Sequence, residues 1–126
     1  TEKLIVDTDI ALPLDRLDTF LARMTPRLAA LDPEARELVI AHLGDGNIHY
    51  TAYPSHGAPA HLAAIRAAVA AEAVALGGSF SAEHGVGVSK RATMAAHKDP
   101  VALSVMAAIK AALDPKGILN PGKVLP

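Results

Sequence analysis

The chain has no cysteine and no tryptophan, and it contains only two phenylalanines and two tyrosines. The lack of cysteine excludes disulfides and thiolate ligands, so a metal site in this chain must use nitrogen and oxygen donors. Hydrophobic residues nevertheless make up 51% of the sequence, and many of them are alanine. The core is therefore expected to be rich in helix and poor in aromatic rings.

The chain also lacks a charge excess of either sign. Its 12 basic and 13 acidic residues leave a net charge of −1, which gives no electrostatic argument for binding nucleic acid. No apolar run is long enough to span a bilayer, and no signal-peptide pattern is present. We expect a cytoplasmic protein by default, with peripheral attachment of the parent protein to a membrane as the alternative.

The length of 126 residues fits one domain that can bury a core of its own. The sequence starts without methionine and runs at once into a strand pattern, so we expect a fragment of a longer protein. Alternation and helical spacing predict, in order, a strand at 3–12, a helix at 13–30, strands at 37–43 and 47–53, a helix at 59–76, a short strand at 79–81 and helices at 88–97 and 100–113. The loop histidines His56 and His61 are expected to be exposed.

This order predicts an α+β fold with a ferredoxin-like β-α-β-β-α-β antiparallel sheet and additional C-terminal helices. Both helices of the motif are expected on one face of the sheet. The last helix should bury the face formed by Leu103, Met106, Ile109 and Leu113. We assign residues 1–113 to the domain and residues 114–126 to a tail that is too apolar to be disordered.

A possible hairpin lies at the centre of the chain, where Asp45-Gly46 separates apolar runs at 38–40 and 48–53. The pair predicts a two-residue type I′ turn, whose central residues both need positive φ. In a hairpin symmetric about this pair, His42 faces His49, and the two imidazoles can converge on one metal ion. Alternatively, they are polar residues bonded to backbone or water, and a slip of one residue would put them on opposite faces.

A second candidate segment combines Glu83 and His84 with glycines at 85 and 87. In an extended strand the two side chains would point to opposite faces, so both can reach one site only if the backbone bends. The glycines allow such a bend because they accept positive φ. Two imidazoles and one carboxylate make a metal set with open positions, and a further imidazole remains for proton transfer. Each residue alone is more typical of a loop surface.

Three motifs in sequence carry a resemblance to a known family. They are His42-x-Gly44-Asp45-Gly46-Asn47-x-His49, Glu83-His84-Gly85-x-Gly87-x-x-Lys90-Arg91 and Asp114-Pro115-x-Gly117-Ile118-Leu119-Asn120-Pro121-Gly122-Lys123. With this order and spacing, nearly the whole chain resembles the FAD-linked oxidase C-terminal domain. That family includes the D-lactate, glycolate and D-2-hydroxyglutarate dehydrogenases.

The resemblance implies oxidation of a small 2-hydroxy acid, such as D-lactate or glycolate, by FAD. A divalent metal, with zinc as the expected ion, would be held by His42, His49 and Glu83, and it would anchor the substrate. His84 would then be the general base, since a neutral imidazole can accept a proton near pH 7. Asp45 and Asn47 are expected to fix the hairpin and to orient a histidine.

The hydride needs an acceptor that no side chain can provide, and this sequence has no glycine-rich phosphate motif. The resemblance therefore implies an upstream FAD-binding domain in the same parent protein. Asn120 and Lys123 match the part of the tail that returns toward that domain, and we expect them to contact the cofactor. A homodimer is left open.

Two residues depart from the family pattern. Thr51 stands where many members carry asparagine, and Asp7 stands where the dehydrogenases of larger dicarboxylates carry lysine. Both positions contact substrate in those relatives, so a small substrate is favoured over one resembling D-2-hydroxyglutarate. The competing hypothesis is a ferredoxin-like binding or regulatory module in which the histidines are structural.

Overall fold

The computed structural model describes residues 4–126, so Lys3, at the start of the first predicted strand, lies outside the described residues. The chain forms two compact units, residues 1–84 and residues 85–126. No helix in the described part of the chain is long and apolar enough to cross a membrane.

The first unit contains an antiparallel sheet of three strands in the order β1-β3-β2. The strands are β1 (Val6–Ala11), β2 (Arg36–His42) and β3 (Asn47–Tyr53). The α+β class and the antiparallel sheet are thus confirmed. The predicted strand at 79–81 is reduced to one bridge, in which Ala11 and Ser79 exchange backbone hydrogen bonds of 3.0 and 2.8 Å. The full ferredoxin-like order is therefore not confirmed.

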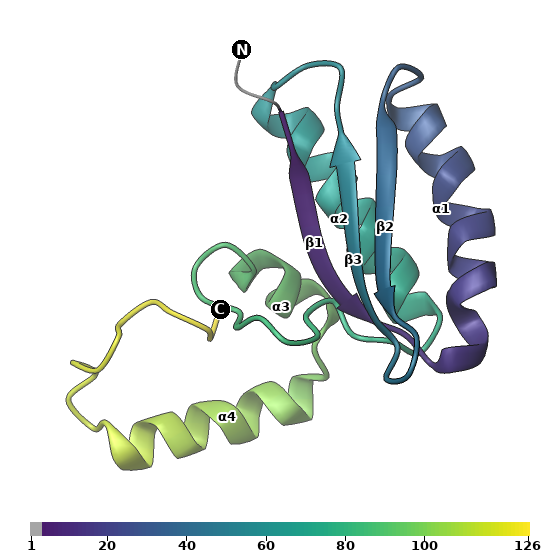
Figure 1. The fold of residues 1–126 in the computed structure, drawn as a ribbon. Coiled ribbons are helices and arrows are strands. Elements are labelled where there is room, and N and C mark those ends of the chain that lie inside the picture. Colours follow the sequence, from purple (N-terminus) through teal and green to yellow (C-terminus); the bar gives the residue numbers. More distant parts are fainter. Residues whose placement is uncertain (1–3) are drawn as a thin grey trace. The chain divides into compact units, whose positions relative to one another are not determined.

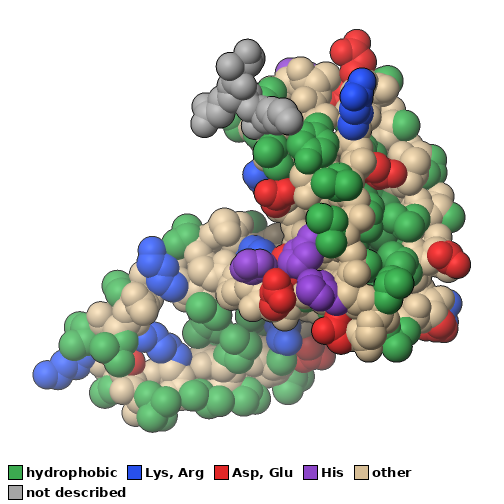
Figure 2. Space-filling view, in the orientation of Figure 1, with side chains coloured by type: hydrophobic (Ala, Val, Ile, Leu, Met, Phe, Trp, Pro, Cys, Tyr) green, Lys and Arg blue, Asp and Glu red, His purple; other side chains and the backbone are tan. Residues whose placement is uncertain are grey.

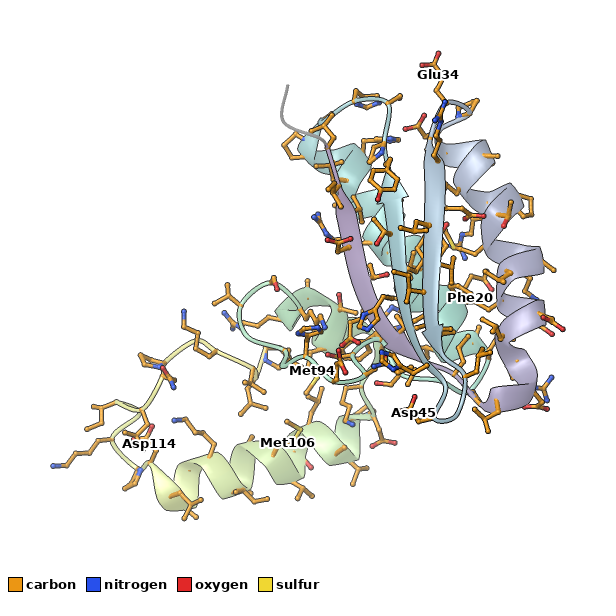
Figure 3. All side chains as sticks on the ribbon, in the orientation of Figure 1. Phe20, Glu34, Asp45, Met94, Met106 and Asp114 are labelled. Carbon is orange, nitrogen blue, oxygen red and sulfur yellow. The ribbon has the colours of Figure 1, made fainter. Side chains whose placement is uncertain are left out.

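Both helices of the first unit lie on the same face of the sheet, as predicted (Figure 1). A 3₁₀ turn, η1 (Leu14–Arg16), leads into α1 (Leu17–Leu31), and α2 (Pro59–Ala75) follows β3. Phe20 of α1, labelled in Figure 3, is fully buried and packs edge-on against Tyr50 of β3, with ring centroids 5.8 Å apart. The core between helices and sheet consists mainly of Val6, Ile10, Phe20, Met24, Leu28, Ile48, Tyr50, Ile65 and Val69.

The hairpin between β2 and β3 differs from the predicted one by two residues in register. His42 pairs with Asn47, and His49 pairs with Ile40, so the loop has four residues. The carbonyl of His42 accepts from the amides of Asp45 and Gly46, and the Asp45 carboxylate accepts from the Asn47 amide at 3.0 Å. Of the two predicted turn residues only Gly46 has positive φ, so a type I′ turn does not form. Because the shift is two residues, His42 and His49 still share a sheet face.

The second unit contains α3 (Arg91–His97), α4 (Pro100–Leu113) and the tail. Asp99 caps α4 as its sequence position suggests, accepting from the amides of Val101 and Ala102. The predicted buried face of α4 is wrong for this chain: no residue of α4 is buried, and Leu113 is 76% exposed. A trough of about 490 Å³ lies between α4 and the tail.

The tail of the second unit is held by a few polar contacts. Asp114 is buried and accepts from the amides of Ile118 and Leu119, while Arg91 donates from Nε to the Leu125 carbonyl at 2.8 Å. The apolar side chains of Ile118 and Leu119 remain exposed. The assignment of 1–113 to one domain and 114–126 to a tail that meets an absent domain stays a prediction.

Candidate functional site

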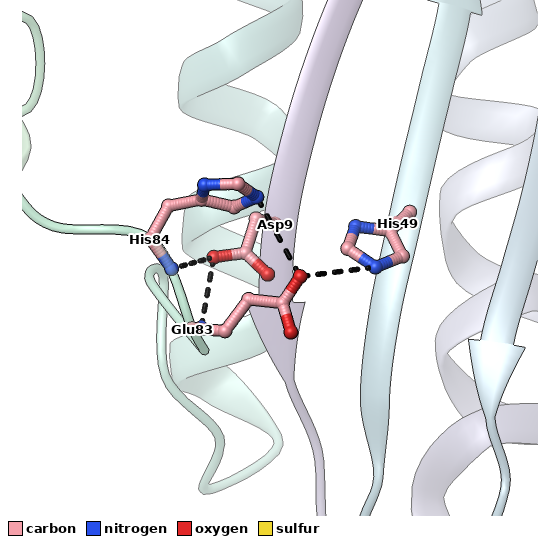
Figure 4. Close-up of side chains that lie close together, drawn as sticks. All are labelled: Asp9, His49, Glu83 and His84. Atoms are coloured by element: carbon pink, nitrogen blue, oxygen red, sulfur yellow. Dashed lines mark hydrogen bonds and ion pairs between the residues drawn. The ribbon is translucent and has the colours of Figure 1, made fainter.

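Four titratable side chains of the first unit converge at the open face of the sheet (Figure 4). One nitrogen or oxygen atom from each of Asp9, His49, Glu83 and His84 lies within 4.8 Å of each of the others. His49 Nε2 is 3.5 Å from Glu83 Oε1, and His84 Nε2 is 3.6 Å from that same oxygen. The predicted bend at Glu83-His84 is thus present, since both side chains reach one place.

These distances suit a shared cation. Ligand atoms about 2.1 Å from a tetrahedral ion lie roughly 3.4 Å from one another. The separation of 3.5 Å between His49 Nε2 and Glu83 Oε1 is close to that spacing. The donors are imidazole nitrogen and carboxylate oxygen, a combination that suits zinc and other divalent transition metals. His49 and Glu83 therefore fit a shared metal ion without a large rearrangement of these two residues.

His42 lies beside this group rather than within it. Its ring centroid is 5.5 Å from that of His49, with the rings at 72°. Among the described residues, the converging group includes two of the three predicted ligands, His49 and Glu83, but not His42. His42 and His49 lie on one sheet face at diagonal positions, within reach of each other but not directly opposed. The role of His42 as a ligand stays a prediction.

The group is accessible from solvent. The side chain of His49 is 29% exposed, that of Glu83 53% and that of His84 66%. Figure 2 shows histidine and acidic side chains gathered on one face of the molecule, next to hydrophobic side chains. Exposed residues of β2 on this face include Leu38 and Ile40. A ligand could thus reach His84 more freely than His49.

Asp9 is the member of the group that the sequence did not assign to a site. It lies on β1 between Thr8 and Ile10, is only 6% exposed and pairs regularly with His49. Its Oδ2 accepts hydrogen bonds from the amides of Ala82, Glu83 and His84, at 3.1, 3.0 and 2.9 Å. The available sequence signal was an acidic residue next to Ile10 and Ala11 in a predicted strand, because a charged residue must find a partner if it is buried.

Asn47 is directly opposite His42 and is almost fully buried. In the described part of the chain its side-chain oxygen has no hydrogen-bond partner. A ligating histidine usually donates its second ring N–H to such an acceptor. The position is therefore compatible with the predicted role of Asn47 in orienting a histidine.

The two predicted cofactor contacts belong to the second unit. Asn120 has a left-handed backbone with φ of 44°, a conformation that asparagine tolerates. Asn120 and Lys123 both line the trough beside α4. Their contact with FAD stays a prediction.

Comparison with known proteins gives the family. Residues 2–124 match the family described as FAD linked oxidases, C-terminal domain. The chain belongs to this family. This confirms the resemblance that the three motifs indicated.

Several curated relatives of this family member are dehydrogenases. The mitochondrial D-2-hydroxyglutarate dehydrogenase of Bos taurus is 42% identical over 119 residues, covering 94% of this chain and 21% of the relative. The corresponding enzyme of Arabidopsis thaliana is 39% identical over 118 residues, with the same coverage. A probable mitochondrial D-lactate dehydrogenase of Danio rerio is 31% identical over 121 residues, covering 94% of this chain and 24% of the relative.

The FAD-linked oxidase domain thus spans about a fifth to a quarter of the length of these relatives. Their names place them in mitochondria, which gives no support to the cytoplasmic expectation for this chain. That expectation stays a prediction.

Proposed function

We propose that this chain is the substrate and metal domain of an FAD-dependent dehydrogenase that oxidises a 2-hydroxy acid. The observation that carries the proposal is the convergence of His49, Glu83 and His84 on the open sheet face. Family membership supports the flavin chemistry, and the names of the relatives support a hydroxy-acid substrate.

The residues divide between anchoring and proton transfer. His49 and Glu83, joined by His42 on the same sheet face, would hold a divalent ion, with zinc as the expected one. When bound, such an ion supplies positive charge for the substrate's carboxylate and hydroxyl oxygens. His84 has the most exposed ring of the group, and its Nε2 would take the proton from the substrate hydroxyl.

The flavin, held by a domain outside this chain, supplies the acceptor for the hydride from the substrate carbon. The exposed apolar residues of the open sheet face suit contact with such a domain, because soluble surfaces rarely leave large apolar patches uncovered. Asn120 and Lys123 are proposed as contacts on the cofactor side. A homodimer stays a prediction.

The substrate is proposed to be small, in the class of D-lactate or glycolate. Asp7 and Thr51 form the next residue pair on the same sheet face after Asp9 and His49. The Asp7 carboxylate there would repel the second carboxylate of a dicarboxylic acid. The named relatives include dehydrogenases of both D-2-hydroxyglutarate and D-lactate, so the family alone does not choose between them.

Zinc binding by the 126-residue chain tests the metal part of the proposal. Calorimetric titration should show one tight site, and His49→Ala should weaken it at least tenfold. His56→Ala is the matched control, since this loop histidine belongs to the same unit but lies outside the group. Its zinc affinity should equal that of the unaltered chain.

The flavin part is tested with the longer protein that carries this domain. Under anaerobic conditions D-lactate or glycolate should bleach the flavin absorbance, and a chelator should prevent the bleaching. If neither zinc binding nor bleaching by any 2-hydroxy acid is observed, the binding-module hypothesis replaces this one.

A further inference from the structure

Asp9 holds three consecutive backbone amides with one carboxylate oxygen. The three hydrogen bonds run from Ala82, Glu83 and His84 to Oδ2, and they join β1 to a segment more than seventy residues later in the chain. The Ala82 amide is shared between Oδ2 and the backbone carbonyl of Asp9, which lies 3.2 Å from it. Hydrogen bonds to an ionised acceptor are about twice as strong as neutral ones.

This arrangement explains how Glu83 and His84 reach the same place. Neighbouring residues in an extended strand point to opposite faces, but three successive amides can meet one oxygen only if the backbone curls around it. Glycine freedom does not explain the bend, because Gly85 has no positive φ and the positive φ of Gly87 comes after the bend. The curl is held by Asp9.

We infer that Asp9 is a positioning residue for the proposed site: its buried carboxylate fixes the Ala82–His84 backbone so that Glu83 and His84 converge with His49. The inference rests on the proposed function, which it extends to a residue outside the proposed ligand and base set. Three N–H donors meet Oδ2, so this oxygen of Asp9 acts through the backbone of Glu83 and His84.

Asp9→Asn and Asp9→Ala in the 126-residue chain test the inference. Asparagine keeps the shape and one acceptor oxygen, while alanine removes both acceptor and charge. Asp18→Asn is the matched control, since Asp18 belongs to the same unit but is exposed on α1 and lies outside the converging group. Amide exchange of Ala82, Glu83 and His84 is measured by NMR, with the buried core residues Tyr50 and Val69 reporting global stability.

The expected result is local. Exchange at 82–84 should rise at least tenfold in Asp9→Ala and less in Asp9→Asn, while core exchange changes far less. The nuclear Overhauser contact between the rings of His49 and His84, whose centroids are 6.3 Å apart, should weaken in the same order. Zinc affinity should fall by about 10–100-fold, the usual effect of losing a residue that orients metal ligands. The control should match the unaltered chain in all three measurements.

The inference is overturned if exchange at 82–84 stays unchanged in Asp9→Asn and Asp9→Ala, or if it rises while zinc affinity does not fall. Should Asp9→Ala fail to fold, Asp9→Asn decides alone. Should the unaltered chain bind no zinc, the metal part of the proposed function fails, and amide exchange with the ring contact then decides the positioning role separately.

Discussion

Thr51 donates a hydrogen bond from Oγ1 to Asp7 Oδ1 at 2.7 Å, and the two residues are direct cross-strand partners. At these two positions the sequence is expected to depart from the pattern of its family. They are therefore one structural unit rather than two separate differences. The pair follows Asp9 and His49 along the same face, at a spacing of about 7 Å for two residues of a strand.

Asp7→Lys is predicted to shift substrate preference toward dicarboxylic acids. A charge about 7 Å away at an effective dielectric constant near 20 contributes roughly 2 kcal/mol, so reversing it should raise the preference for D-2-hydroxyglutarate over D-lactate by tenfold or more. The measurement is the ratio of kcat/KM for the two acids in the longer flavoprotein. Asp18→Lys, an equal charge change at an exposed position of α1, is the control and should leave the ratio unchanged. An unchanged ratio in Asp7→Lys would remove this pair from the substrate site.

His84→Ala is predicted to lower kcat by about 10²–10⁴-fold, the usual range for one acid–base group. Its metal content should stay the same, because the proposed ligands are His42, His49 and Glu83. His42→Ala should instead lose metal and activity together. Metal analysis and steady-state kinetics on the longer flavoprotein separate the two effects. Loss of metal in His84→Ala would make His84 a ligand, a role that its distance of 3.6 Å to Glu83 also permits.

Periodic patterns predicted the elements of the first unit well, because amphipathic helices and alternating strands are set by local spacing. The expected helix at 59–76 corresponds to α2, and the strands at 37–43 and 47–53 correspond to β2 and β3. The exact register of the hairpin was wrong. In the observed register the Asp45 carboxylate accepts a hydrogen bond from the Asn47 amide. Residue preferences alone do not choose between this turn and the predicted two-residue turn.

The site was predictable only in part for a related reason. His49, Glu83 and His84 belong to recognisable sequence motifs. Asp9 instead acts through hydrogen bonds with residues 82–84, which are distant from it in the sequence. His61 shows the same limit: composition predicted an exposed loop histidine, yet its side chain is only 12% exposed, and its Nε2 lies 2.9 Å from Asp32 Oδ2. Such pairings follow from tertiary structure, which local pattern does not encode.

Asp114→Ala is predicted to release the tail of the second unit. Its carboxylate accepts from the amides of Ile118 and Leu119 and pairs with the Lys110 ammonium, which together with those amides lowers the carboxyl pKa. Without these contacts, amide exchange at 118 and 119 should rise at least tenfold. Lys116→Ala, at an exposed neighbouring position, should change neither amide. If amide exchange at 118 and 119 were the same in Asp114→Ala as in the unaltered chain, other contacts would hold the tail.

Asp32→Asn is predicted to destabilise the first unit in a pH-dependent way. Asp32 is buried at the end of α1, and its carboxylate accepts from the amides of Ser55 and Glu34 and faces His61 Nε2. The Ser55 amide, followed by His61, holds the carboxyl pKa well below its usual range, although burial acts in the opposite direction. These contacts tie the end of α1 to the loop before α2.

The direction of the pH effect on stability follows from this lowered pKa. A carboxyl whose pKa is depressed on folding stabilises the folded state above its unfolded pKa of about 4, and that stabilisation is lost as pH falls toward the folded value. The Tm of the unaltered chain should therefore fall more steeply below about pH 4 than that of Asp32→Asn. The difference between the two should be largest near neutral pH and should shrink in acid.

Thermal unfolding followed by circular dichroism across this pH range measures both effects. Asp15→Asn is the control, because Asp15 is highly exposed and its ion pair with Arg16 is a surface contact of little stabilising effect. Its Tm should follow that of the unaltered chain at every pH. A constant gap between Asp32→Asn and the unaltered chain from neutral pH down to about pH 2 would show that Asp32 acts through shape and hydrogen bonding, without its charge.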